Sequence, residues 1–161
     1  MSDAARSPQS WEPRDATPEA RPTSFPRVML QFSHPGRCYQ PLEWLTVEYA
    51  VSGIAEDRTR AMERSLLWYT EGKGEEDMGV HFFERFTTQE TIAGVMPEGS
   101  FAVQLPSSPL SYEGVIVKIR WCVRLRVFFE TGRDHVSEHV FTLGSVPPAA
   151  IPVRAVERLY V

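Results

Sequence analysis

The chain has 161 residues, of which 42% are hydrophobic and 24% are charged, proportions that fit one globular domain of ordinary size. Its formal net charge of −4 at pH 7 excludes general attraction of the whole molecule to nucleic acid, so we expect no nucleic-acid partner. The apolar runs are too short to cross a bilayer and the first 25 residues lack the apolar centre of a secretory signal, so we expect a cytoplasmic protein with no membrane span.

The two ends of the chain differ in composition from its middle. Residues 1–24 are rich in Pro, Ser, Ala and charged residues, and Trp11 is their only aromatic residue. Such a segment buries too little apolar surface to offset its ordering entropy, so we predict a flexible Pro-rich tail. Residues 146–161 carry three prolines before the final AVERLYV, which predicts a C-terminal tail or a docked segment. The sequence therefore predicts a single folded domain over residues 25–145.

The first half of this domain contains runs that alternate between apolar and polar residues. Arg27–Ser33 predicts a first strand that ends at the turn His34-Pro35-Gly36. Leu42–Val51 follows as a half-buried strand, with Trp44, Thr46, Glu48 and Ala50 on one face and four apolar residues on the other. These residues are Leu45, Val47, Tyr49 and Val51.

A hairpin with a long loop is predicted next. Ala61–Thr70 and Val80–Phe86 are its strands, and the Gly-rich acidic segment Glu71–Gly79 joins them. We expect Val80, Phe82 and Phe86 on one face of the second strand. Gln89–Met96 is compatible with one helical turn or none. Ser100–Leu105 alternates again and ends at Pro106.

The strongest signal in the sequence is the alternation from Val115 to Phe129, where nearly every odd position is apolar. We expect six of these side chains in a core, namely Val117, Ile119, Trp121, Val123, Leu125 and Val127. The even positions include four cations that face outward: Lys118, Arg120, Arg124 and Arg126. Val136–Leu143 predicts a returning strand. About seven strands without a long helix are typical of an all-β, antiparallel two-sheet β-sandwich.

The segment SFAVQLPSSPLSYEGVIVKIRWCVRLRVFF, residues 100–129, resembles the amino-terminal domain of arrestin-like proteins. Such domains have a strand ending in Leu-Pro, a loop containing Pro, Ser, an aromatic residue and Gly, and then a long alternating strand. The matching residues are Phe101, Leu105, Pro106, Pro109, Ser111, Tyr112, Gly114, Ile119, Trp121 and Val123. An earlier strand fits through Tyr39, Pro41, Glu43, Leu45 and Val47, and a later strand through Phe141 and Leu143, so the resemblance covers residues 26–144.

This resemblance implies an immunoglobulin-like sandwich of the arrestin, retromer-subunit and sporulation-control kind. It also implies a role in scaffolding or in recognition of a protein partner. A full arrestin has two such domains, and this chain is long enough for one. Arg27 is the only cation on the first strand, where the family carries paired lysines.

The chain lacks the residue patterns of catalytic and metal sites. Cys38 and Cys122 form none of the spacings of disulfide frameworks or zinc sites, so we expect reduced thiols. His135 and His139 are expected on a strand, where four residues span ~13 Å, too far for one shared metal ion. No Gly-x-Ser-x-Gly elbow is present. We therefore predict a protein that is not an enzyme and has no cofactor and no metal.

The four outward cations, Lys118, Arg120, Arg124 and Arg126, are the candidate partner-binding residues and are called the basic stripe below. Arginine forks bind carboxylates, so the stripe predicts an acidic protein partner. The alternative is a solvated sheet face whose cations pair across strands with residues such as Glu48 or Glu138. We expect a protein-interaction adaptor. A small-ligand or carbohydrate-binding sandwich is the alternative, with Trp44, Trp68 or Tyr69 as an exposed aromatic platform, and an unrecognised hydrolase is the third hypothesis.

Overall fold

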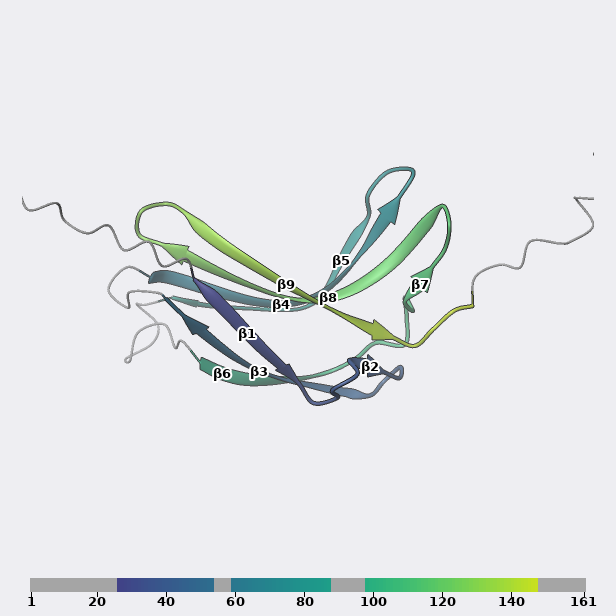
Figure 1. Ribbon diagram of the computed structural model, residues 1–161, viewed down its shortest axis with the longest axis horizontal. Helices are drawn as coiled ribbons and strands as arrows, with labels where there is room; N and C mark the ends of the chain where they lie inside the picture. The colour runs from purple at the N-terminus through teal and green to yellow at the C-terminus, as the bar shows by residue number, and fades with distance from the viewer. Residues whose placement is uncertain (1–25, 54–58, 88–97, 148–161) are drawn as a thin grey trace, which may run out of the picture.

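The computed structural model describes residues 26–53, 59–87 and 98–147, which form two β-sheets that lie face to face (Figure 1). The tail predicted at residues 1–24, the Gln89–Met96 segment and the chain from residue 148 onward lie outside the described residues. No helix occurs in the described ranges, so none there is long and apolar enough to cross a membrane.

The smaller sheet contains three antiparallel strands. Their order is β1 (Arg27–Phe32), β3 (Trp44–Ser52) and β6 (Glu98–Gln104). The central strand β3 alternates between buried and exposed side chains along its length, which is the pattern expected of a sheet with one face on a core. Leu45 and Val47 on its inner face are fully buried.

The larger sheet has six strands, with β8 at its centre. Their order is β2 (Cys38–Tyr39), β9 (Asp134–Leu143), β8 (Val117–Phe129), β4 (Thr59–Gly72) and β5 (Met78–Thr87), and β7 (Tyr112–Glu113) pairs with the start of β8. The seven long strands of the two sheets coincide with the seven predicted ones. The two-residue strands β2 and β7 are too short to leave a periodic signal in the sequence.

The core lies between the sheets and is centred on Trp121, whose side chain is fully buried. Its indole Nε1 donates a hydrogen bond to the Pro109 carbonyl at 2.8 Å, so burial leaves no indole donor unsatisfied. The inner positions that follow Trp121 on β8 are also fully buried, as predicted; these are Val123, Leu125 and Val127.

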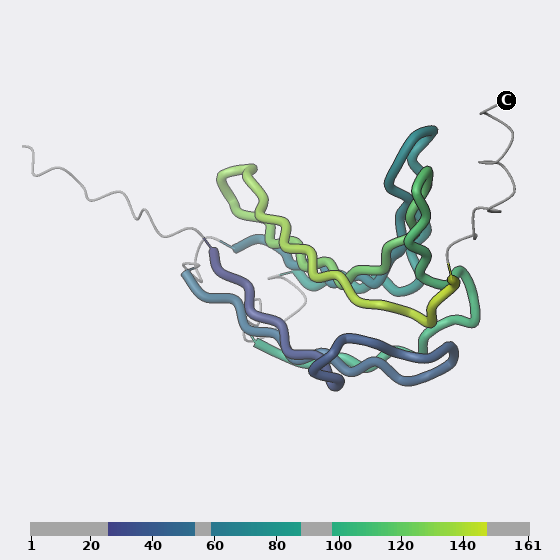
Figure 2. Tube along the Cα trace, turned by 45° about the vertical axis from the view of Figure 1, so that its right-hand side comes forward, coloured from purple at the N-terminus to yellow at the C-terminus, as the bar shows by residue number. Residues whose placement is uncertain are grey.

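The prediction of a core position was wrong for Val117, which is 38% exposed. The start of β8 leaves the space between the sheets together with β7, the end of β4 and the start of β5 (Figures 1 and 2). We call residues 70–80 and 112–118 the projecting arm. The amide of Lys73 donates to the Ile116 carbonyl at 3.0 Å, so the two loops of the arm are joined at the tip. Ile119, at the base of the arm, is half-buried.

A β-bulge in β5 corrects a second prediction. Leu66 pairs with Phe82 and the next residue, Leu67, pairs with Val80, so His81 is an extra residue in β5. Val80 consequently lies on the outer face, and Phe82 on the inner face. The sequence-based expectation that Val80 shares a face with Phe82 and Phe86 was wrong, because a single inserted residue reverses the alternation.

Two polar side chains of the larger sheet close the open side of the sandwich against the edge strand β6. Arg64 lies between the sheets, donates to the Ser100 carbonyl at 3.0 Å and binds the Glu84 carboxylate at 2.6 Å. His81 uses Nε2 to contact the Gln104 carbonyl at 2.8 Å. Backbone carbonyls at a sheet edge are therefore covered by side chains of the opposite sheet.

Candidate functional site

The basic stripe lies on the outer face of the larger sheet, and each of its cations is bound to a carboxylate. Lys118 is 3.4 Å from Glu113, and Arg120 is 2.6 Å from Glu113 and 2.9 Å from Glu71. The other two pairs are Arg124 with Glu138 at 2.7 Å and Arg126 with Asp134 at 2.5 Å. The stripe is therefore a ladder of cross-strand ion pairs rather than a row of free cations.

Strand register explains these pairs. β8 places Arg124 opposite Glu138 of β9, the pairing that the alternative reading expected. Glu48 was the other expected counter-ion, and that expectation was wrong because Glu48 lies on β3 in the opposite sheet. The hydrogen bond that Arg120 donates to the Glu71 carboxylate raises the pKa of Arg120 above its ordinary value. All four cations of the stripe are thus ion-paired with carboxylates of the same domain.

An apolar row crosses the same outer face. Val80, Leu67, Cys122 and Val140 stand side by side on four neighbouring strands. Cys122 is fully buried, and that burial raises the pKa of its thiol to about 12. Cys38, the other free cysteine, is exposed. The Cys122 thiol is thus an apolar packing group and not a nucleophile at neutral pH.

The outer face of the smaller sheet is hollowed, and two carboxylates but no cation of the described residues line the hollow. Its volume is about 730 Å³, and it is lined by Met29, Leu30, Gln31, Glu48, Tyr49, Ala50, Glu98, Gly99 and Ser100. Two rows of side chains that are neighbours across β1, β3 and β6 form the hollow. The short side chains of Ala50 and Ser100 lie beside longer ones in these rows. Within the described residues, neither Glu48 nor Glu98 forms an ion pair, and the lining contains no cation. We call this feature the acidic hollow.

Apolar side chains are exposed on the same face as the acidic hollow. Met29 in its lining is 67% exposed, and Trp44, which shares the outer face of β3 with Glu48, is 60% exposed. Four residues of strand separate Trp44 from Glu48, or ~13 Å. Trp68 and Tyr69 belong to β4 in the other sheet, so the described residues contain no aromatic platform built from all three.

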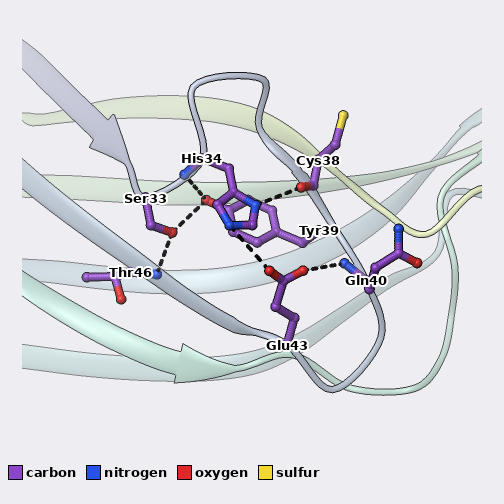
Figure 3. Close-up of polar contacts among 7 residues, drawn as sticks. All are labelled: Ser33, His34, Cys38, Tyr39, Gln40, Glu43 and Thr46. Atoms are coloured by element: carbon purple, nitrogen blue, oxygen red, sulfur yellow. Dashed lines mark hydrogen bonds and ion pairs between the residues drawn. The ribbon is translucent and has the colours of Figure 1, made fainter.

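A polar network holds the turn beside Trp44 (Figure 3). The His34 ring stacks on Tyr39, with centroids 4.5 Å apart, and its Nδ1 is 3.0 Å from the Cys38 carbonyl. Its Nε2 is 3.3 Å from Glu43, whose second oxygen accepts the Gln40 amide at 2.7 Å. Both ring nitrogens therefore lie next to oxygen atoms that can accept a hydrogen bond. The Cys38 sulfur points away from this ring (Figure 3).

This network supports a strained turn. The Glu43 amide donates to the Gln40 carbonyl at 3.2 Å, which closes a turn with Pro41 and Leu42 at its centre. Leu42 has a φ of 65°, a value that favours Gly or Asn, and its side chain is 59% exposed. The turn thus presents Leu42 close in sequence to exposed Trp44. The Leu42 conformation left no signal in the sequence, because Leu is unusual at that position of a turn.

The described residues contain no group of three or more His, Cys, Asp or Glu side chains that could hold a metal ion. The described residues present two faces of different chemistry, an ion-paired face on the larger sheet and an acidic, partly apolar face on the smaller sheet. The sequence predicted the first face and missed the second. Glu48 and Glu98 are fifty residues apart, and only the pairing of β3 with β6 brings them onto one surface.

No protein-family model matches the chain, and a search of curated proteins finds no match. Among solved structures, the chain is similar to the sporulation control protein Spo0M from Bacillus subtilis, with 18% identity and a TM-score of 0.51 over 73% of this chain. The chain spans 49% of that protein's length. A superoxide reductase (neelaredoxin) from Ignicoccus hospitalis matches with 10% identity and a TM-score of 0.45, over 74% of this chain and 80% of that protein. The similarity to Spo0M supports the arrestin-like type of sandwich implied by the sequence.

Proposed function

We propose that this chain is a non-catalytic protein-interaction domain that docks a basic, partly apolar segment of another protein on the acidic hollow. One observation carries the proposal. Glu48 and Glu98 form no ion pair among the described residues, whereas every cation of the basic stripe forms one. A cationic segment would supply what the hollow lacks.

The two faces differ in the interactions that each must lose when a partner binds. An acidic partner at the basic stripe would compete with four carboxylates that already neutralise it, so little net energy is gained. A basic partner at the acidic hollow breaks no ion pair of the described residues, and the unpaired carboxylates attract it from a distance. The acidic partner remains a prediction from the sequence, and the side-chain geometry favours the opposite sign of charge.

Apolar anchors complete this docking surface. Large exposed side chains near the centre of an interface carry most of its binding energy, and Trp is the residue most enriched at such positions. Met29 lies in the acidic hollow, and Trp44 and Leu42 extend the face beyond it. We therefore expect the partner segment to combine Lys or Arg with apolar residues.

A small ligand with a cationic group is the second candidate. The volume of about 730 Å³ falls within the range of small-molecule pockets, roughly 300–1,000 Å³. Such pockets are usually lined by converging apolar side chains. The acidic hollow is floored instead by strand backbone and short side chains, which fits an extended or helical segment better.

The test is direct binding of two synthetic peptides of equal length, one of Lys and Leu and one of Glu and Leu, to the full chain. The double variant Glu48→Lys/Glu98→Lys should lose binding of the Lys–Leu peptide together with its salt dependence. The matched control is Glu75→Lys/Glu76→Lys, the same charge change on exposed residues of the projecting arm. An equal loss of peptide binding in both variants would show that only the net charge of the molecule matters, and it would contradict the proposal.

A further inference from the structure

The outermost strand of the larger sheet, β5, is long for an edge strand. It has ten residues and pairs with β4 on one side, and no strand of the described residues pairs with its other side. An unpaired edge presents a row of free backbone donors and acceptors, which is a template for another strand. Natural edges are usually kept short or guarded by charged side chains that project past them.

The charged and titratable side chains of β5 do not guard its edge, because each turns back onto the same molecule. Glu84 binds Arg64 at 2.6 Å, and Arg85 binds Glu63 at 2.5 Å. His81 reaches the Gln104 carbonyl of the smaller sheet at 2.8 Å. These contacts draw the polar groups toward β4 and β6 and leave the edge itself without a projecting charge.

The other side chains along β5 are apolar, and several remain in solvent. Met78, Val80 and Phe83 are 54%, 55% and 55% exposed. All three lie on the outer face, opposite Tyr69, Leu67 and Ser65 of β4. The β4–β5 pair nearest the edge carries two cations and two carboxylates in two ion pairs, so its local charge is balanced.

We propose that β5 pairs antiparallel with β5 of a second copy of this chain, so that the two larger sheets join into one continuous sheet. A two-fold axis perpendicular to the sheet keeps the outer faces of both copies on the same side. Phe83 then lies opposite Arg85 of the second copy, a favourable contact of a cation over a ring.

Charge explains why a second copy fits this edge. Because each carboxylate and each cation at the edge is paired inside its own chain, two copies meet without bringing unpaired like charges together. The bulge at His81 interrupts the strand, so the regular pairing segment is 82–86. This pairing does not involve the acidic hollow, which lies on the other sheet.

Sedimentation velocity of the full chain over a wide range of concentration tests the proposal. We expect a reversible monomer–dimer equilibrium, and Phe83→Lys should abolish the dimer by placing a charge on the unguarded edge. The matched control is Val136→Lys, an exposed apolar residue on the outer face of β9 that should leave the dimer intact. Circular dichroism checks the fold, and Arg85→Glu serves as the deciding variant where Phe83→Lys does not fold.

Amide hydrogen exchange separates strand pairing from another contact. On raising the concentration into the dimer range, amides of residues 82–86 should gain protection while those of β9 stay unchanged. A chain that is monomeric at every concentration would overturn the proposal. A dimer without added protection in β5 that resists both Phe83→Lys and Arg85→Glu would overturn it equally.

Discussion

Trp121 shows how one residue organises the interior. Its ring is fully buried, contacts Phe141 with centroids 6.0 Å apart, and has its indole N–H satisfied by the Pro109 carbonyl. Trp121→Ala should lower the free energy of unfolding by about 3–5 kcal/mol through loss of buried area and formation of a cavity. Denaturant unfolding measures this, and Trp121→Phe, which retains much of the ring volume, should cost distinctly less. A change below about 1 kcal/mol for the alanine variant would mean that the ring does not support the core.

The two cysteines should differ sharply in reactivity. Burial raises the pKa of the Cys122 thiol to about 12, so almost no thiolate forms there at neutral pH, whereas Cys38 is exposed. We expect a thiol-specific reagent to modify only Cys38 in the folded protein and both cysteines after unfolding. Mass spectrometry of the labelled peptides identifies the site. Rapid labelling of Cys122 in the native state would show that the outer face around it opens.

His139 should make stability depend on pH. Its burial, together with the nearby charge of Arg37, lowers its pKa below the ordinary 6.5. The unfolded chain therefore takes up this proton more readily, so the stabilising contribution is full above about pH 6.5 and is lost as the pH falls. His139→Gln should reduce the loss of stability between pH 7 and 5, measured by denaturant unfolding. An unchanged slope would assign the effect to other groups.

At the scale of the elements, the ion pairs between β8 and β9 act as a ladder on a solvated face. Arg124→Glu should destabilise the fold by about 1 kcal/mol, because it sets a carboxylate opposite Glu138. Adding Glu138→Arg restores opposite charges and should recover most of the loss. The double-mutant cycle in thermal or denaturant unfolding measures the coupling. Zero coupling would show that the two side chains do not interact in solution.

The strands were predictable where the alternation of apolar and polar residues alone determines which side chains are buried. β8 alternates over thirteen residues, and that pattern correctly assigned Trp121 inward and Arg124 outward. The bulge at His81 was not predictable, because one extra residue in a strand leaves no mark in composition. Arg64 was also missed as an inward residue, since a cation between two sheets becomes favourable only when Glu84 and aromatic rings surround it.

The candidate site was only partly predictable for a related reason. A stripe of cations along one strand is visible in the sequence, but the carboxylates that neutralise it come from three other strands. The acidic hollow depends on register between β3 and β6, which sets Glu48 opposite Ser100 and Ala50 opposite Glu98. Whether a charged side chain is free or ion-paired is therefore determined by its cross-strand neighbours, which the sequence does not show.

At the scale of the whole molecule, the two outer faces differ in which charged and apolar side chains of the described residues remain without a partner. The larger sheet presents paired charges, an apolar row and the edge of β5, and the smaller sheet presents unpaired carboxylates with exposed Met29 and Trp44. A formal net charge of −4 gives the molecule an excess of negative charge that is consistent with attraction of a basic partner. The sandwich thus holds two surfaces of distinct chemistry back to back on one core.

The measurement that tests this account most directly is an NMR titration of the isotopically labelled full chain with the Lys–Leu peptide. The account predicts saturable shifts of backbone amides around Met29, Glu48 and Glu98, with those of the basic stripe unmoved. Shifts centred instead on the basic stripe with the Glu–Leu peptide, and none at the acidic hollow with the Lys–Leu peptide, would contradict it.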